Sequence, residues 1–219
     1  MNIILTIISI ILCFSTLVLI EKLFKKEGIY AWMVFATICA NILVCKNIKI
    51  NGTIFTLGNI MFSSNFLATD IIAEKYGFKE SKKGVYLALV FAIIFIASIQ
   101  IGLLFIPDAS DIAQPFMKGL FTINFRVTFS SILLFFLSNL ADVYLFNKIK
   151  EKIPKKLWLR NNVATLTTNC IENFLFVLLA FVNIYSFKLM MEIAITTCIA
   201  EIIIGLCDTP FIYLSKKLK

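Results

Sequence analysis

The chain has 219 residues, of which 60% are hydrophobic, and its mean hydropathy is +0.92. A soluble domain of this size does not need so much apolar surface, so the composition indicates an all-α integral membrane protein. The net charge of +8 excludes little by itself, but the basic residues stand in short segments between apolar runs. That distribution argues against a nucleic-acid partner and favours contacts with membrane lipid.

Seven apolar runs are long enough to form helices that cross a bilayer, which takes about 20 residues. In chain order they are 3–20, 29–45, 54–72, 85–106, 125–146, 163–182 and 189–214. The first run lacks the basic n-region and the A-x-A cleavage site of a signal peptide, so we expect it to be retained. The last run is long and must tilt or extend past the bilayer. No linker divides the chain, so we expect one transmembrane domain over residues 1–219.

The basic residues also predict the orientation. Sixteen of the 21 lie in the segments 21–28, 73–84 and 147–162 and in the C-terminal tail, which alternate with the segments on the other side. Because cytoplasmic segments hold the excess of lysine and arginine, these segments are expected inside. The sequence therefore predicts a cytoplasmic C-terminus and, with seven spans, an external N-terminus.

The chain has no histidine, which excludes histidine-bound metals and nucleophiles activated by histidine. Six cysteines show no CxxC spacing and lie in or beside apolar runs, so we expect them to pack as small hydrophobic residues. The sequence therefore predicts no metal and no cofactor.

Several polar side chains lie inside the apolar runs. Asp70 and Glu74 are one turn apart at the inner end of the third run and share a helix face. Asp142 lies at a similar depth in the fifth run. A polar stripe extends to mid-bilayer in the sixth run through Thr165, Asn169, Glu172 and Asn173, and another in the seventh contains Thr197, Glu201, Gly205 and Asp208. Ionisable groups inside a membrane usually mark a substrate or ion pathway.

Each acidic residue also has a structural interpretation. Glu74 can be solvated beside Lys75, Asp70 can cap a helix end, and Asp142 can pair with Lys148 at the membrane boundary. Glu172 has no water to reach at mid-span, so its structural alternative is a hydrogen bond to a neighbouring helix.

Three blocks of the sequence resemble the queuosine precursor transporter family, which is also placed among vitamin uptake transporters. The first block is LATDIIAEKYG, where the matching positions are Thr69, Asp70, Ile71, Ile72, Glu74, Tyr76 and Gly77. The second block, 124–150, matches at Arg126, Ser130, Asp142, Phe146 and Asn147, and the third, 157–176, at Trp158, Arg160, Thr165, Asn169, Glu172 and Phe176. Together they cover about residues 29–214, so the first run precedes a six-helix core.

The resemblance implies import of 7-deazaguanine bases through the inner membrane of a bacterium. The candidates are the nitrile or aminomethyl precursor of the tRNA nucleoside queuosine, or queuine. A carboxylate can accept both the ring N–H and the exocyclic amine of such a base, and Glu172 is our first choice. The residues expected to contact the substrate are Glu172, Asn169, Asp70, Asp142, Arg126 and Thr69. Those expected to gate the path or couple it to protons are Asp70, Glu74 and Asp142.

Other functions stay open at this point. No G-x-x-x-x-G-K-[ST] loop is present, so the chain works alone or captures substrate for a separate ATPase. An intramembrane protease using Asp70 and Asp142 would be expected to show a G-x-G-D stretch, which is absent. An assembly or lipid-binding protein would not require Glu172 at mid-span. The oligomeric state is left open.

Overall fold

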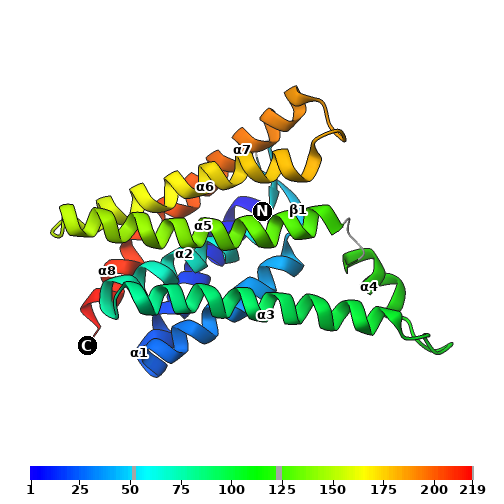
Figure 1. The fold of residues 1–219 in the computed structure, drawn as a ribbon, viewed down its shortest axis with the longest axis horizontal. Helices are drawn as coiled ribbons and strands as arrows, with labels where there is room; N and C mark the ends of the chain where they lie inside the picture. Colours follow the sequence, from blue (N-terminus) through cyan, green and yellow to red (C-terminus); the bar gives the residue numbers. More distant parts are fainter. Residues whose placement is uncertain (51–52, 122–124, 219) are drawn as a thin grey trace.

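The computed structural model describes residues 1–50, 53–121 and 125–218, and within them the chain is a helical bundle with one short β-hairpin (Figure 1). The elements are α1 (Asn2–Leu43), β1 (Asn47–Ile50), β2 (Thr53–Thr56), α2 (Gly58–Lys75), α3 (Phe78–Leu104), α4 (Gln114–Phe121), α5 (Phe125–Lys152), α6 (Leu157–Phe181), α7 (Phe187–Leu206) and α8 (Thr209–Lys217).

Helix α1 is two helical halves joined by a sharp break. Lys25 has φ 54° and ψ −139°, which no α-helix accommodates. A straight helix of 42 residues would separate its ends by about 60 Å. Instead, the Asn2 amide donates a hydrogen bond of 3.1 Å to the carbonyl of Lys49, just beyond the other end. The two halves therefore run antiparallel, and the break lies in the basic segment predicted to separate the first two runs.

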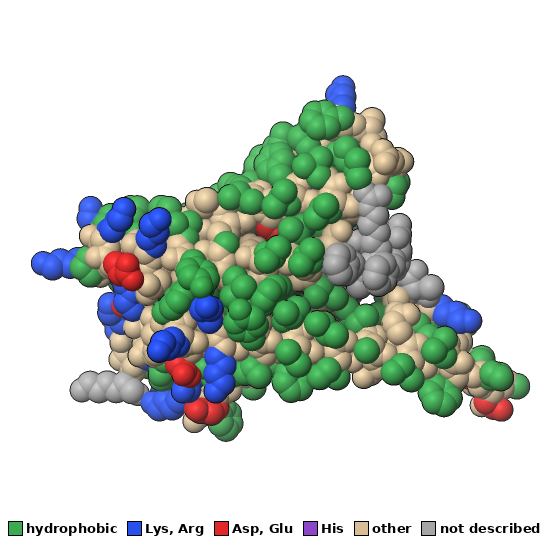
Figure 2. Space-filling model, in the orientation of Figure 1, with side chains coloured by type: hydrophobic (Ala, Val, Ile, Leu, Met, Phe, Trp, Pro, Cys, Tyr) green, Lys and Arg blue, Asp and Glu red, His purple; other side chains and the backbone are tan. Residues whose placement is uncertain are grey.

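The bundle exposes apolar side chains and buries polar ones, as a multi-pass membrane protein does. Among the described residues, five helical segments are long and apolar enough to cross a membrane, including Phe78–Leu104 and Leu157–Phe181. Large apolar side chains such as Ile203 are exposed, while asparagine, aspartate and threonine are buried. In Figure 2 hydrophobic side chains cover the middle of the visible face, and basic side chains gather at the end that holds the C-terminus in Figure 1. This end is called the basic end below.

Helix α2 lies at the centre of the bundle and is buried on every side. It packs against α1, α3, α5, α7 and α8, and each residue from Ser63 to Ala73 is buried. A helix without an exposed face belongs in the middle of a bundle. Residues 67–73 of the first block, LATDIIAEKYG, therefore face neighbouring helices rather than lipid.

Two predicted boundaries are wrong. The third run was expected from residue 54, but residues 53–56 pair with 47–50 in the hairpin and α2 begins at Gly58. Isoleucine, threonine and phenylalanine in these strands favour β-structure over helix. The last run does not continue through one helix, because α7 ends at Leu206 and α8 begins at Thr209. Pro210 near the start of α8 cannot donate a helical hydrogen bond to α7.

The break in α1 brings its halves into close contact at Gly28. A Cβ added there would lie 2.8 Å from the carbonyl oxygen of Ile20 and 2.8 Å from its Cγ2 atom. We therefore expect Gly28→Ala to lower the free energy of unfolding by about 1–3 kcal/mol, as overpacked sites do. Gly102→Ala is the matched control, because a Cβ there meets nothing within 4 Å. Thermal unfolding in detergent compares the two, and equal stability of both variants would contradict this packing.

Candidate functional site

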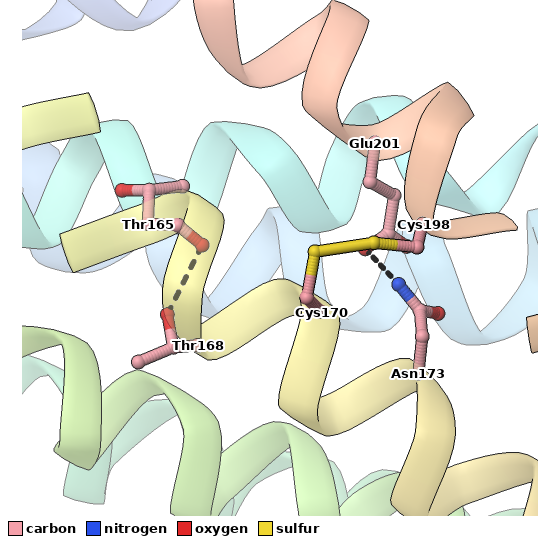
Figure 3. The surroundings of a disulfide bond; sticks show 6 residues. All are labelled: Thr165, Thr168, Cys170, Asn173, Cys198 and Glu201. Carbon is pink, nitrogen blue, oxygen red and sulfur yellow. Dashed lines mark hydrogen bonds between the residues drawn. A yellow bond between two sulfur atoms is a disulfide. The ribbon is translucent and has the colours of Figure 1, made fainter. Parts of the chain in front are cut away.

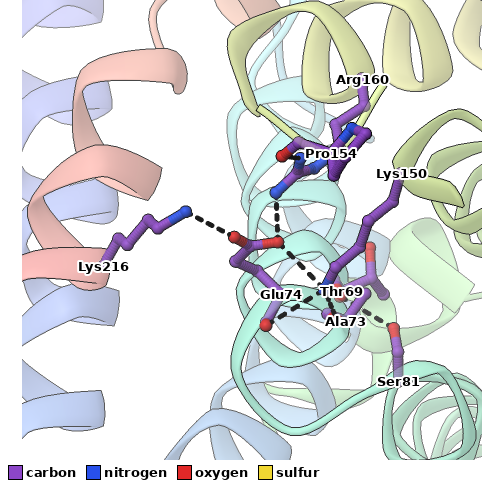
Figure 4. Close-up of polar contacts among 8 residues, drawn as sticks. All are labelled: Thr69, Ala73, Glu74, Ser81, Lys150, Pro154, Arg160 and Lys216. Atoms are coloured by element: carbon purple, nitrogen blue, oxygen red, sulfur yellow. Dashed lines mark hydrogen bonds and ion pairs between the residues drawn. The ribbon is translucent and has the colours of Figure 1, made fainter. Parts of the chain in front are cut away.

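Glu74 joins α2 to three other helices at the basic end (Figure 4). Its Oε1 accepts from Lys216 of α8 at 2.8 Å, and its Oε2 lies 3.0 Å from the Lys150 ammonium of α5 and pairs with Arg160 of α6. The three cations offset the cost of burying the Glu74 carboxylate. We call these four residues the Glu74 network.

Arg160 is the buried cation of the network, with a side chain only 1% exposed. It also donates 2.6 Å to the carbonyl of Pro154, and its guanidinium lies 5.3 Å from the centre of the Phe146 ring. The structural interpretation of Glu74 as a solvated residue beside Lys75 is therefore wrong, since Lys75 pairs with the buried Glu21 instead.

Three aspartates lie close together one turn deeper in the bundle. Asp70 of α2, Asp142 of α5 and Asp208 at the α7–α8 break are each at most 1% exposed and within electrostatic range of one another. Asp142 accepts from Thr69 at 3.4 Å and from Thr165 at 3.2 Å. The proximity of Asp70 and Asp142 follows the expectation from their equal depth, and threonines rather than Lys148 hold Asp142.

Asp208 is a third member that the predicted site did not include. Its Oδ1 accepts from the Asn161 amide at 2.6 Å. Apart from Asp142, which lies within hydrogen-bond range, Asp70 has no hydrogen-bond partner among the described residues. Asp208 belongs to the polar stripe of the seventh run, which was its signal in the sequence. Its side chain reaches Asn161 at the break between α7 and α8, which was not predicted.

Glu172 lies between α5 and α7, beside Ser138 and within electrostatic range of Glu201. Asn173 on the next position donates 2.7 Å to Glu201, as Figure 3 shows. Asn169, one turn before, is 1% exposed, and neither polar atom of its amide has a partner among the described residues. The sixth and seventh runs therefore meet along their polar stripes.

A disulfide joins Cys170 of α6 to Cys198 of α7 beside these polar residues (Figure 3). The expectation that all six cysteines pack as free hydrophobic residues is wrong for this pair. The two cysteines are 28 positions apart with no motif spacing, so only the pairing of α6 with α7 brings them together.

A small recess lies among α1, α2, α3 and α5, with a volume of about 10 Å³, room for about one water molecule. Its walls are mainly apolar and aromatic, and its polar members are Thr37, Asn41, Asn65, Ser131 and Asn139. A second hollow of about 80 Å³ shares Asn41 and Ser131 with it. The second hollow also touches Cys45 and Phe121, so the two form one tract toward the end that carries the β-hairpin and α4. This end is called the hairpin end.

The predicted site residues lie beside this recess rather than in its wall. Of the described residues, Asp70, Asp142 and Glu172 are not among those that line it, whereas Asn65 and Asn139 are. Arg126 belongs to the stretch whose side chains the structure does not describe. Thr37, Asn41 and Asn65 were not among the predicted site residues. In the sequence, each of them is a polar residue within an apolar run, and Thr37 and Asn41 are one helical turn apart.

Removing the charge of Glu74 leaves Arg160 buried without its partner. Breaking a buried ion pair from one side costs about 3–5 kcal/mol, while the more exposed Lys150 and Lys216 contribute little. We expect Glu74→Gln to lower the free energy of unfolding in detergent by about 3 kcal/mol. Glu151→Gln at the exposed end of α5 is the control, with almost no expected change. Equal stability of the two variants would mean that the Glu74 network does not hold the basic end together.

Comparisons with known proteins indicate a membrane transporter. A family described as "Putative vitamin uptake transporter" matches residues 56–215. A probable queuosine precursor transporter of Bacillus subtilis (strain 168) is 36% identical over 210 residues, which cover 95% of this chain and 92% of the relative. No solved structure matches the chain.

Proposed function

Because this chain belongs to the vitamin uptake transporter family, we propose that it imports queuosine precursors into the bacterial cytoplasm. It is a membrane transporter and not an enzyme, and the family resemblance of its sequence blocks is confirmed. The proposed substrates are 7-deazaguanine bases, namely the nitrile or aminomethyl precursor, or queuine. The observation that carries the proposal is the 36% identity to a probable queuosine precursor transporter along nearly the whole of both chains.

The proposed topology has seven spans in the bacterial inner membrane, with the N-terminus outside and the C-terminus inside. The two antiparallel halves of α1 supply the first two spans, and α2, α3, α5, α6 and α7 supply the others. The gathering of basic residues at one end supports a cytoplasmic basic end. The hairpin end then faces outward, so the tract that contains the recess is reached from outside.

The Glu74 network is the proposed inner gate. It ties α2 to α5, α6 and α8 at the basic end, so a base can leave for the cytoplasm only after these helices separate. Asp70 and Asp142, one turn further in, are the proposed proton-coupling pair. Two carboxylates that repel one another in a buried site can share a proton, and loss of that proton changes the balance of charge next to the gate.

Glu172 and Asn169 are proposed to contact the base on its way through the bundle, with Thr69 supporting Asp142 beside them. Glu172 is a partly buried carboxylate of α6 that lies near Ser138 of α5 and Glu201 of α7. Such a group can accept two donors of a guanine-like edge, and a hydrogen bond to a charged group contributes about 1.5–3 kcal/mol. Arg126 is proposed to act at the outer end of α5.

Queuosine in tRNA reports on this import directly. In a bacterial strain that cannot make the precursor and lacks its own importer, we expect each transported base to restore tRNA queuosine only when this protein is expressed. Glu172→Gln should lower the restored level about tenfold at limiting base. Glu192→Gln, at the start of α7, serves as the control and should match the wild type.

Equal queuosine with and without the protein, for every base at limiting concentration, would refute import. Restoration that occurs normally in the Glu172→Gln strain would refute the role of Glu172 and leave import standing.

A further inference from the structure

Asp208 joins the start of α8 to α6. It lies at the break between α7 and α8, and its side chain is only 1% exposed. Its Oδ1 accepts 2.6 Å from the Asn161 amide, and Thr209 lies within hydrogen-bond range of the same carboxylate. The Asn162 amide in turn donates 2.8 Å to the Thr209 hydroxyl. Two successive asparagines of α6 therefore hold the start of α8.

Asp208 also belongs to the group of aspartates around Asp142. Asn161 and Thr165 are four residues apart on α6, so they share a helix face. The first donates to Asp208 and the second, at 3.2 Å, to Asp142. Asp70 of α2 completes the group, within electrostatic range of both other carboxylates. The three carboxylates therefore lie on one side of α6, close enough to repel one another.

Two further ionisable groups among the described residues lie near the three aspartates. Arg160, next to Asn161 on α6, is within electrostatic range of Asp70. Cys207, next to Asp208, has a free thiol. Arginine keeps its charge throughout the physiological pH range, and substitution removes the thiol. A proton that this group gains or loses near neutral pH therefore lies on one of the carboxylates, where the repulsion between buried like charges holds it.

The other end of α8 is tied to α2 at the basic end. Lys216 pairs with Glu74 at 2.8 Å, as Figure 4 shows. Lys75, the next residue of α2, donates 3.1 Å to the carbonyl of Ser215 and 3.2 Å to that of Leu218. Helix α8 is therefore a short separate helix that begins at the aspartates and ends at the proposed inner gate.

We infer that Asp208 is a third residue of the proposed proton-coupling site and transmits its protonation to the inner gate through α8. The inference rests on the proposed function, which supplies the pair Asp70 and Asp142 and the gate at Glu74. A charged Asp208 accepts a charge-assisted hydrogen bond from Asn161, which is about twice as strong as a neutral one. When a proton passes from the pair to Asp208, an O–H bond breaks on the pair and forms on Asp208. The pair regains its charge, and the bond to Asn161 weakens.

The weaker bond loosens the first turn of α8. Because α8 has only nine residues, its last turn moves with its first and leaves Glu74 and Lys75. The basic end then opens. Asp208 is a positioning residue in this scheme, since it acts by holding α8 and not by touching the substrate. The inner gate opens more readily when Asp208 carries the proton.

The exposure of Ser215 reports the position of α8 without any substrate. Its side chain is 1% exposed, so a cysteine in its place reacts with a maleimide only when α8 leaves the bundle. Ser215→Cys is introduced into the full-length protein with the four free cysteines replaced and the Cys170–Cys198 disulfide kept. Lys217→Cys, at an exposed position of α8, corrects for the effect of pH on the thiol itself.

We expect the corrected labelling rate of Ser215→Cys to be about fivefold higher at about pH 6 than at about pH 8, because the proton weakens the bond that holds α8. Asp208→Asn should remove this pH dependence, and Asp208→Glu should keep it. Asn161→Ala removes the donor, so it should raise the rate at the higher pH to that at the lower. Glu151→Gln, at the exposed end of α5, is the control and should keep the full pH dependence.

Equal rates at the two pH values, a higher rate at the higher pH, or a pH dependence that survives in Asp208→Asn would overturn the inference. Thermal unfolding in detergent tests it with all native cysteines present, in case the substituted background does not fold. The two ends of α8 are about 12 Å apart, so independent contacts there would shift Tm additively. We expect Asn161→Ala and Lys216→Gln together to lower Tm by less than the sum of their single effects, because either one releases α8. Additive shifts would overturn the inference.

These measurements use no base, so they are separate from the test of import. A protein that restores tRNA queuosine but lacks the Asp208-dependent labelling refutes the inference and leaves the proposed function standing. A protein that shows this labelling and restores no queuosine refutes the proposed function, and with it the role of α8 in import.

Discussion

The fold depends on how a hydrocarbon-facing bundle accommodates charge in its interior. An unpaired carboxylate in a bilayer costs several kcal/mol, so each acidic group needs a cation, a hydroxyl or another polar partner. Helix α2 meets this constraint because it is surrounded by other helices. At one end Glu74 pairs with Arg160. One turn deeper, Asp70 lies beside Asp142, which accepts hydrogen bonds from two threonines. The central helix is therefore polar where a lipid-facing helix must be apolar.

The same constraint divides the bundle into a closed end and an open end. The Glu74 network closes the basic end by joining helices that are far apart in the sequence. Toward the hairpin end the helices leave the recess and its neighbouring hollow. A carrier must expose its site to each side of the membrane in turn, and in the proposed cycle this arrangement is the state open toward the hairpin end. In the proposed opposite state, Glu74 separates from at least one of its partners so that the substrate can leave at the basic end.

The sequence predicts the parts of this structure that follow from local chemistry. Apolar runs identified the membrane helices, the lysines at 22–26 identified the break in α1, and Asp70 and Asp142 at equal depth were expected to converge. The hairpin was missed because its strands are short and one was read as the start of a long apolar run. Contacts between distant residues were also out of reach. Arg160 with Glu74, Cys170 with Cys198, and Asn65 with Thr37 each depend on which helix faces which. Hydropathy predicts whether a residue lies in the membrane, but not which side chains it contacts there.

The central claim is the proposal that a carboxylate among the helices, Glu172 of α6, accepts the donor edge of a flat base in transit. An experimental structure of the protein with 7-cyano-7-deazaguanine bound tests this claim most directly. The account predicts the two donors of the base within hydrogen-bond distance of the Glu172 carboxylate. A bound base that makes no contact with Glu172 would contradict it.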